Sequence, residues 1–418
     1  MEKLTFLTEA HVRGIRGNYG TPAYVYDEET LRAYAKAVLA FPNPYGLTAR
    51  FAMKALPNVA VVQIFSSMGL HIDCSSGFEA ERALRAGVPP DHIQITAQQM
   101  PSNLKELVDQ GVQFTACSLY QLEAYGNLFP KSEVCVRINS GLGSGHSNRT
   151  NVGGPSASFG IWHEYLPDVL EIANRFGLCV SRMHTHIGSG ADPEAWHKCA
   201  QLSLAIAARI PEVRTLSLGG GFKVGRMALE PSADLNAIGN RVSKDWEAFY
   251  STHRRKLHME IEPGTYLVAN AGAIVSTIID VVDTGAGGYN FIKIDTGMTE
   301  VIRPSMYGAQ HPIVVVPATD EKRGAKDYIV VGHCCESGDV LTPEPGNPEG
   351  LQTRTLTEAK IGDLLVIGGA GAYCAGMSAK NYNSFPEAPE VLLTSNDDFR
   401  LVRERQSMDQ MLANEIPL

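Results

Sequence analysis

The chain has 418 residues, of which 44% are hydrophobic and 19% are charged, enough for two globular domains with large cores. Its formal net charge of −9 comes without a basic patch, which excludes nucleic acid as an expected partner. No apolar run reaches membrane-spanning length and the first residues lack a signal-peptide core, so we expect a cytoplasmic protein without membrane contacts.

The N-terminal part predicts a short helix within residues 1–20, with Thr8 as its N-cap, and then a strand at 22–26. Asp27 or Glu28 begins an amphipathic helix that continues to Leu39.

From Thr48 onwards, short apolar strands alternate with helical segments. The predicted strands are 48–53, 70–74, 92–96, 112–116, 133–138, 179–185, 214–218 and 257–261. The helical segments between them include 77–86, 101–110, 165–176, 193–208 and 237–251. Strands that alternate with helices imply a parallel sheet, and eight repeats within about 220 residues favour a (β/α)8 TIM barrel over an open sheet.

After Gly264 the pattern changes to short β-branched segments separated by Gly, Pro and Asp turns, without a helical period until about 408–414. These segments are 266–280, 290–295, 312–316, 328–333, 363–368, 390–394 and 399–403. They predict a separate antiparallel β-barrel or sandwich domain, which the strand at 22–26 is expected to join. We therefore expect a barrel domain at 28–264 and a β domain formed by 1–27 and 265–418, which contributes substrate-binding and dimer contacts.

The eight cysteines include no CxxC pair, so neither a zinc site nor a disulfide framework is expected. Most are interpreted as reduced packing residues. Cys334 and Cys335 differ from the others because they precede the polar segment 336–339, where a thiol has less reason to be buried.

Active sites of such barrels lie at the carboxyl ends of the strands. The chemically distinctive residues at these ends are Lys54, Asp73, Asn139, His184, His186, Gly219, Gly220, Gly221 and Glu262. Each also has an ordinary structural interpretation: a surface lysine, a core histidine, a tight glycine turn or a glutamate that caps a turn. The His-x-His pair could bind zinc, but no third ligand has a supporting spacing, so no metal site is expected.

The combination of these residues favours pyridoxal phosphate as a cofactor. Lys54 can form a Schiff base, with Lys223 as the alternative lysine, and an imidazole can stack on the ring. The glycine amides can hold the phosphate. Glu262 can hydrogen-bond the pyridine nitrogen and keep it protonated, so that the ring accepts electrons.

Several motifs resemble those of the alanine-racemase-fold (type III) pyridoxal-phosphate-dependent amino-acid decarboxylases, and among these most closely the diaminopimelate decarboxylases. The motifs are Phe51-Ala52-Met53-Lys54, His184-x-His186-Ile187-Gly188-Ser189, Gly219–Gly221, Glu262-Pro263-Gly264, Arg303-Pro304-x-x-Tyr307-Gly308, Cys335-Glu336-Ser337-Gly338-Asp339, Gly371-Ala372-Tyr373 and Asn381-Tyr382-Asn383-Ser384. The resemblance extends from about Thr21 to the C-terminus. It implies decarboxylation of meso-2,6-diaminopimelate to L-lysine and CO2, the last step of lysine biosynthesis.

The resemblance also implies roles for individual residues. Lys54 is the Schiff-base lysine. Asp73 belongs to the cofactor site, and His186 stacks on the cofactor ring. Ser189, Gly219–Gly221 and Tyr373 hold the phosphate, and Glu262 contacts the pyridine nitrogen. In a homodimer with composite sites, Cys335 reprotonates the carbanion, Glu336 binds the distal amino group, and Arg303 and Tyr307, beside Tyr373, bind the distal carboxylate.

Two departures from the family pattern concern the substrate. Thr265 stands where the family usually has an arginine that helps to hold the distal carboxylate, and Thr299-Glu300 replaces the usual Asn-Asp. A hydroxyl cannot replace a bidentate guanidinium. Either Arg303 acts with another residue, for which Arg149 in the 139–160 loop is a candidate, or the substrate is another basic amino acid such as D-lysine or D-ornithine. A racemase is less expected because Glu262 strengthens the electron sink, and a non-catalytic cofactor-binding regulator would not need Cys335.

Overall fold

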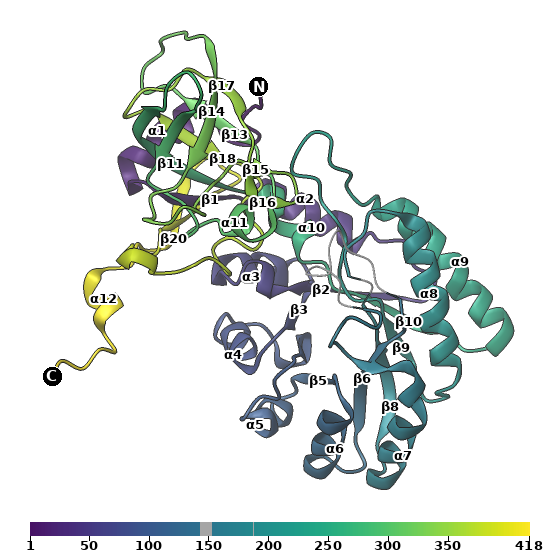
Figure 1. Ribbon diagram of the computed structural model, residues 1–418. Helices are drawn as coiled ribbons and strands as arrows, with labels where there is room; N and C mark the ends of the chain where they lie inside the picture. Colours follow the sequence, from purple (N-terminus) through teal and green to yellow (C-terminus); the bar gives the residue numbers. More distant parts are fainter. Residues whose placement is uncertain (143–152, 187) are drawn as a thin grey trace. The chain divides into compact units, whose positions relative to one another are not determined.

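The computed structural model describes residues 1–142, 153–186 and 188–418, and these form two compact units (Figure 1). Arg32–Val224 and Pro231–Leu267 form one, which we call the barrel unit. Met1–Leu31, Gly225–Glu230 and Val268–Leu418 form the other, which we call the β unit.

Parallel strands close into a barrel in the first unit, which confirms the predicted fold class. In spatial order, the strands in the described part of the barrel are β5 (Gln113–Ala116), β4 (Ile93–Thr96), β3 (His71–Cys74), β2 (Leu47–Ala52), β10 (His258–Ile261), β9 (Thr215–Ser217), β8 (Cys179–His184) and β6 (Glu133–Asn139). β6 pairs with β5 and so completes the ring. Each predicted strand is present with small shifts at its ends, and the short β7 (Ile161–Trp162), which was not predicted, pairs with β6.

Helices connect the barrel strands, and several begin at a residue whose side chain caps the first turn. They are α3 (Val59–Ser67), α4 (Gly77–Arg85), α5 (Leu104–Asp109), α6 (Leu119–Leu128), α7 (Leu166–Phe176), α8 (Pro193–Ala208) and α9 (Leu235–His253). Asn58, Ser76 and Asp192 each accept a hydrogen bond from a backbone N–H of the helix that follows. These caps fix the residue at which each loop ends and the following helix begins.

The β unit contains a branched sheet in the order β17-β14-β12-β11-β1-β19-β20, with β18 paired to both β11 and β13. Its strands are β1 (Ala23–Asp27), β11 (Gly272–Asp283), β12 (Asn290–Ile294), β13 (Ile313–Val316), β14 (Ala325–Val331), β17 (Arg354–Thr357), β18 (Leu364–Ile367), β19 (Glu390–Leu393) and β20 (Phe399–Arg403). The predicted β domain is confirmed, and β1 joins it by pairing with β11. Most pairs are antiparallel, but β1–β19 and β12–β14 are parallel.

Some details of the β unit differ from the sequence prediction. The strand predicted at 266–280 begins only at Gly272, because the preceding residues form α10 (Thr265–Val268) and a single 3-10 turn, Ala269–Ala271. The prediction also missed the short α11 (Arg303–Tyr307), β17, and the hairpin of β15 (Pro343–Glu344) and β16 (Asn347–Leu351). These elements are too short to show a hydrophobic period.

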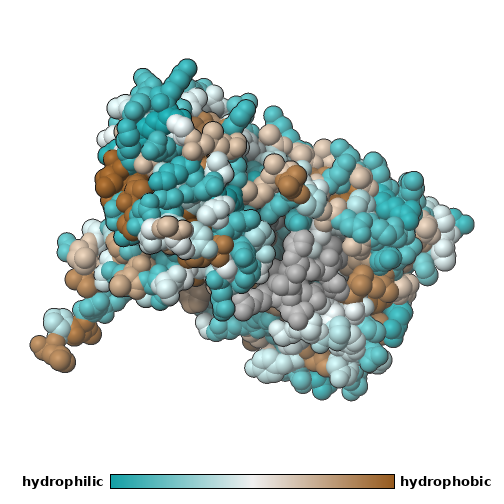
Figure 2. Space-filling model, turned by 45° about the horizontal axis from the view of Figure 1, so that its top comes forward, coloured by the Kyte–Doolittle hydropathy of each residue, from teal (hydrophilic) through white to brown (hydrophobic). Residues whose placement is uncertain are grey.

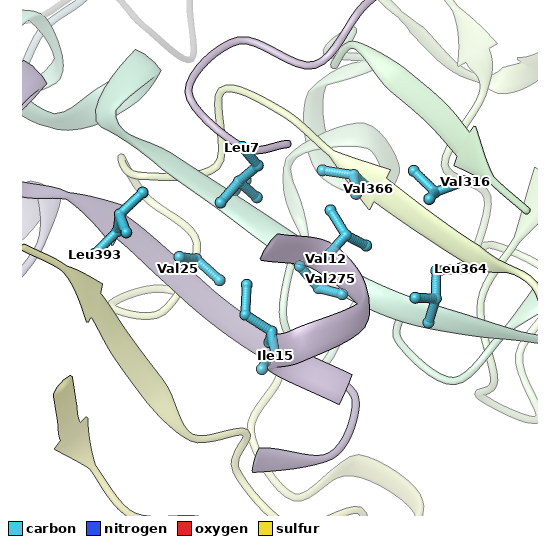
Figure 3. Packing of buried hydrophobic residues seen from close by; sticks show 11 residues of the cluster. Leu7, Val12, Ile15, Val25, Val275, Val316, Leu364, Val366 and Leu393 are labelled. Carbon is cyan, nitrogen blue, oxygen red and sulfur yellow. The ribbon is translucent and has the colours of Figure 1, made fainter. Parts of the chain in front are cut away.

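An apolar core holds α1 (Glu9–Tyr19) against the sheet of the β unit (Figure 3). Val12 and Ile15 of α1 are fully buried and pack with Val25, Val275 and Val366 of the strands. The predicted N-cap is confirmed, since the Thr8 side chain accepts a hydrogen bond from the backbone N–H of His11. α2 (Glu28–Leu39) then leads into the barrel unit.

The coloured residues on the face shown in Figure 2 include both hydrophilic and hydrophobic ones. Within the described ranges, none of the helices combines the length and the apolar character that a membrane crossing requires. After β20, the chain continues through α12 (Met408–Leu412) to an exposed apolar end that includes Ile416 and Leu418.

Candidate active site

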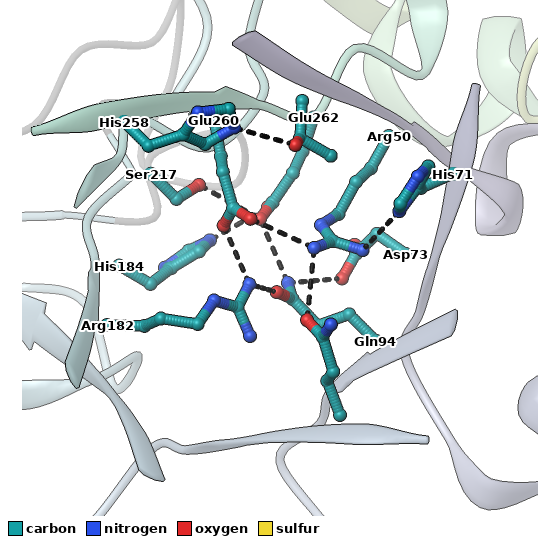
Figure 4. Close-up of polar contacts among 12 residues, drawn as sticks. Arg50, His71, Asp73, Gln94, Arg182, His184, Ser217, His258, Glu260 and Glu262 are labelled. Atoms are coloured by element: carbon teal, nitrogen blue, oxygen red, sulfur yellow. Dashed lines mark hydrogen bonds and ion pairs between the residues drawn. The ribbon is translucent and has the colours of Figure 1, made fainter. Parts of the chain in front are cut away.

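A buried carboxylate, Glu262, lies directly after the carboxyl end of β10 in the barrel unit (Figure 4). Its Oε2 is 2.8 Å from Nε2 of His184, and its Oε1 accepts hydrogen bonds of 3.0 Å from both Gln94 and Ser217. Burial by itself raises the pKa of Glu262, but the interactions with His184 and the Gln94 amide outweigh burial and hold the pKa well below its usual value. Glu262 is therefore a fixed, ionised carboxylate that is held by side chains of three other strands.

Asp73, at the end of β3, shares the Gln94 amide with Glu262 but has the opposite ionisation preference. Nε2 of Gln94 is 3.3 Å from Oδ1 of Asp73. Burial and the charge of Glu262 raise the pKa of Asp73 to about 8, although Lys54 and Gln94 act in the other direction. At neutral pH the carboxyl group of Glu262 is therefore ionised and that of Asp73 is protonated.

The direction of the Gln94 amide is set by a second layer of charged residues inside the barrel. Arg182 donates to Oε1 of Gln94, and because a guanidinium can only donate, the amide NH2 must face the carboxyl groups. Arg182 also binds Oε2 of Glu260 at 2.7 Å, and Arg50 binds Oε1 of Glu260 at 2.9 Å (Figure 4). The Arg50–Glu260–Arg182 group therefore orients Gln94 and, through it, Glu262.

Lys54 follows β2 on a single 3-10 turn, Met53–Ala55, and its side chain is exposed. The charge of Lys54 acts on neighbouring groups, since it lowers the pKa of both Asp73 and His186. Lys54 therefore lies at the same end of the barrel as these two residues.

His186 follows β8 and is held as a neutral imidazole. Its Nδ1 accepts a 2.9 Å hydrogen bond from the backbone N–H of Gly188, so this nitrogen carries no proton. Burial, together with the charges of Arg137 and Lys54, lowers the pKa of His186 well below its usual value. A neutral ring in a fixed orientation is suitable for stacking on a flat ligand.

The glycines after β9 pack backbone to backbone against neighbouring loops. Gly219 and Gly221 have φ of +69° and +102°, conformations that favour glycine. A Cβ on Gly220 would lie 2.4 Å from the carbonyl oxygen of Glu262, and one on Gly221 would lie 2.1 Å from that of Gly188. Ser189 is in the loop that packs against Gly221, whose added Cβ would lie 3.4 Å from the Ser189 Cα. Only glycine fits this arrangement.

The helix predicted at 237–251 is confirmed as α9 (Leu235–His253), and the segment Gly225–Glu230, which belongs to the β unit, lies between it and the glycines along the chain. Glu230 stabilises this segment, since its carboxylate accepts the backbone N–H of Arg226 at 2.8 Å. Anion binding at the glycines would therefore depend on backbone amides without the dipole of an adjacent helix.

The remaining predicted residues lie in the β unit. Arg303 and Tyr307 are on α11, and Tyr373 has φ of +58°. Burial lowers the pKa of Arg303, while Tyr307 and Tyr373 are among the groups that act in the opposite direction. Cys335 and Glu336 are exposed on the loop after β14. The backbone N–H of Cys335 donates to Oδ1 of Asn383 at 2.8 Å.

The two units thus hold two groups of predicted residues. Lys54, Asp73, His186, Ser189, Gly219–Gly221 and Glu262 are in the barrel unit, and Arg303, Tyr307, Cys335, Glu336 and Tyr373 are in the β unit. Arg149 lies outside the described residues. The sequence analysis missed Gln94 and Ser217, although the alternation Ile93-Gln94-Ile95-Thr96 marks Gln94 and Thr96 as polar residues of one strand face.

The donor set in the barrel unit fits pyridoxal phosphate. An amine, a neutral imidazole, an ionised buried carboxylate and a glycine loop too tight for any side chain are present at one end of one barrel. When bound, pyridoxal phosphate accepts the electron pair that a departing carboxylate leaves behind.

Comparison with known proteins agrees with this assignment. Residues 28–269 match the family model described as "Pyridoxal-dependent decarboxylase, pyridoxal binding domain", so pyridoxal phosphate is the cofactor. The chain is 34% identical over 423 residues to diaminopimelate decarboxylase of Escherichia coli K12, covering 99% of this chain and 98% of the relative. It is also 34% identical over 410 residues to the Streptomyces coelicolor enzyme of the same name, covering 95% of this chain and 90% of the relative.

A solved structure described as diaminopimelate decarboxylase superposes with a TM-score of 0.91 at 33% identity, covering 98% of this chain and 97% of that one. The superposed part of the chain therefore includes residues of both units. The chain therefore belongs to the pyridoxal-dependent decarboxylases, and within them to the diaminopimelate decarboxylase family.

Proposed function

We propose that the protein decarboxylates meso-2,6-diaminopimelate to L-lysine and CO2 with pyridoxal phosphate as cofactor. The relatives that match almost the whole chain are named for this activity. The structural observation that carries the proposal is the ionised, triply hydrogen-bonded carboxylate of Glu262. A fixed negative charge keeps a pyridine nitrogen protonated, and this favours loss of CO2 over reactions that need a weaker electron sink.

In this proposal the barrel residues bind and orient the cofactor. Lys54 forms the Schiff base, Asp73 assists at the same end of the barrel, and the neutral ring of His186 stacks on the cofactor. Ser189, the glycines Gly219, Gly220 and Gly221, and Tyr373 hold the phosphate. The support for the roles of the barrel residues is their position after the strands and, for the glycines, the exclusion of side chains, whereas the role of Tyr373 follows from the family resemblance.

The residues of the β unit act on the substrate. Cys335 donates the proton that replaces the lost carboxylate, and Glu336 binds the distal amino group. Arg303 and Tyr307, together with Tyr373, bind the distal carboxylate. Because Cys335 and Glu336 are exposed in the single chain, we propose that they act in the site of a second copy within a homodimer.

We also propose that the functional division follows the boundaries expected from the sequence, with cofactor binding by 28–264 and substrate and dimer contacts by 1–27 and 265–418. The eight cysteines are all free thiols, which supports action in the reducing cytoplasm.

The test is release of CO2 by the purified holoenzyme from the meso, LL and DD forms of diaminopimelate, and from D-lysine and D-ornithine. We expect CO2 and L-lysine from the meso form, and no release by Lys54→Ala. Preference for D-lysine or D-ornithine would establish the second candidate, which the neutral Thr265 favours. Bound cofactor without CO2 release from any of these compounds would indicate a non-catalytic binding protein.

A further inference from the structure

Two arginines of the β unit, Arg226 and Arg303, form a cationic cluster. Nε of Arg226 donates to the carbonyl oxygen of Gly369 at 2.8 Å. Its Nη2 atom is buried and has no hydrogen-bond partner among the residues that the structure describes. An unsatisfied guanidinium N–H in a buried position is costly, so this atom needs an acceptor that the described residues do not supply.

Arg303 is oriented by a histidine that does not neutralise it. Nη1 of Arg303 is 2.9 Å from Nε2 of His311, and because the guanidinium can only donate, this imidazole nitrogen must be the acceptor. The proton is then on Nδ1, which donates to the carbonyl oxygen of Gly368 at 2.9 Å. Burial and the two arginines lower the pKa of His311 well below its usual value, so His311 contributes no charge.

The charges in this cluster do not balance. Glu230 is the carboxylate that acts on both arginines, and its Oε2 already accepts the backbone N–H groups of Arg226 at 2.8 Å and Met227 at 3.3 Å. Burial and the positive charge of Arg303 lower the pKa of Arg226 to about 9. Two guanidiniums against one carboxylate leave one excess positive charge, which an anionic ligand would compensate.

The backbone holds Arg226 in this position. Gly369 has φ of +62°, and a Cβ there would lie 2.9 Å from Cγ of Arg226, so the arginine stem lies directly on this glycine. One hydrogen bond to Gly369 uses a single N–H of the guanidinium. The hydrogen bond between Arg226 and Gly369 therefore does not explain why a second buried guanidinium accompanies Arg303.

We propose that Arg226 and Arg303 form a two-arginine subsite for a carboxylate, and that Arg226 is a specificity-determining residue. The inference rests on the proposed function for the identity of the ligand, which is the carboxylate of the substrate carbon chain that is not lost. Two guanidiniums would supply this anchor in a chain whose residue 265 is a neutral threonine.

The test compares two ligands that differ in this carboxylate. Holoenzyme is titrated with meso-diaminopimelate and with D-lysine, which lacks the second carboxylate, and binding is followed by the change in the visible absorption of the cofactor. Arg226→Gln should weaken binding of diaminopimelate about 10- to 150-fold, the effect of losing a charge-assisted hydrogen bond, and change D-lysine binding less than about 3-fold. Arg226→Lys should give a smaller loss with the same selectivity, because it keeps the charge but not the planar fork.

Arg405→Gln is the matched control. Arg405 is also in the β unit and also donates to a backbone carbonyl, that of Pro22 at 2.9 Å, but the charges that act on it are the carboxylates of Asp295 and Glu300. This variant should leave the ratio of the two dissociation constants unchanged.

Each other outcome has a distinct meaning. Equal weakening of both ligands by Arg226→Gln would make Arg226 a structural residue and overturn the inference, as would a variant that binds diaminopimelate normally. If Arg226→Gln does not fold, the ratio of the dissociation constants for diaminopimelate and D-lysine is measured with Arg226→Lys instead, and the same criteria apply. Wild-type protein that binds diaminopimelate no more tightly than D-lysine would instead contradict the proposed function.

Discussion

At the scale of single residues, the site depends on which atoms of Gln94 face which neighbours. Arg182 fixes the amide so that its NH2 group faces Asp73 and Glu262. A carboxylate with three donors stays ionised in spite of burial, whereas Asp73, with fewer donors and a negative neighbour, retains its proton. The two buried carboxyl groups therefore ionise differently because His184 and the Gln94 amide act on Glu262, whereas burial and the charge of Glu262 act on Asp73.

The first prediction concerns Glu262. Glu262→Gln should retain the cofactor, because phosphate and Schiff-base contacts are unchanged, but should lower kcat at least about 100-fold. One charge-assisted contact in a water-poor site contributes roughly 3 kcal/mol of transition-state stabilisation. Cofactor absorbance and kcat at saturating substrate are the two measurements. An unchanged kcat would show that Glu262 has only a structural role in the turn after β10.

The second prediction concerns Gln94. Gln94→Glu keeps an acceptor for Arg182 but places a carboxylate, in place of a donor, against Glu262. The pKa of Glu262 should rise, so the acidic limb of the kcat profile should move to higher pH by about one unit, which corresponds to roughly 1.4 kcal/mol. Gln94→Leu, which removes the donor without adding charge, is the control and should shift the limb less. Identical profiles for the two variants would show that the amide does not govern ionisation of Glu262.

At the scale of elements, the segment between β12 and α11 carries a buried acid, Glu300, within the β unit. Oε2 of Glu300 accepts hydrogen bonds from Thr296 at 2.8 Å and Thr299 at 2.6 Å. Burial raises the pKa of Glu300 to about 7, although these hydrogen bonds act in the other direction. The Thr299-Glu300 departure from the family pattern is thus part of an internal network of the β unit.

The third prediction follows from this raised pKa. The unfolded chain loses the Glu300 proton near pH 4.5 and the folded chain near pH 7, so the unfolded state binds fewer protons in this window. The contribution of this group to the free energy of unfolding is complete below pH 4.5 and falls as the pH rises to 7, by about 3 kcal/mol. Glu300→Gln cannot titrate and should become more stable relative to wild type between pH 4.5 and 7.5, as measured by urea unfolding.

Glu349, an exposed glutamate of β16, provides the control for this measurement. Glu349→Gln should keep a constant difference from wild type over the same range. A constant difference for Glu300→Gln as well would show that Glu300 ionises equally in both states.

At the scale of the whole molecule, the residues proposed to bind the cofactor are in the barrel unit, except Tyr373, and those proposed to bind the substrate are in the β unit. Lys54 and Glu262 are in the barrel unit, and Cys335 and Glu336 are on an exposed loop of the β unit. A division of this kind allows one catalytic site to be completed by two copies of the chain.

The fourth prediction tests the shared site by subunit exchange. Lys54→Ala and Cys335→Ala should each be nearly inactive, but mixing them should restore activity. Random exchange places about half of the dimers in the mixed state, each with one intact site of two, so activity should approach about a quarter of wild type. Mixing Lys54→Ala with Glu262→Gln is the matched control and should restore nothing, because every site then lacks a barrel residue. No recovery in the first mixture, with exchange demonstrated, would contradict the shared site.

The sequence by itself determined the barrel strands, the β domain and the residues at the strand ends. These depend on local patterns: apolar runs of strand length, caps such as Thr8, and residues that directly follow a strand. Short elements were not determined, because the four residues Thr265–Val268 of α10 show no period of their own.

Only the tertiary structure decided which side chains meet. Gln94 and Glu262 are 168 residues apart in the chain, and no local pattern shows that one amide serves both Glu262 and Asp73. The parallel pairing of β1 with β19 likewise joins residues from opposite ends of the chain. Arg226 follows the glycine turn of a barrel strand, yet its guanidinium is held against Gly369 of the β unit. Burial and hydrogen-bond direction at such positions depend on closure of the fold, which brings together residues that the sequence separates.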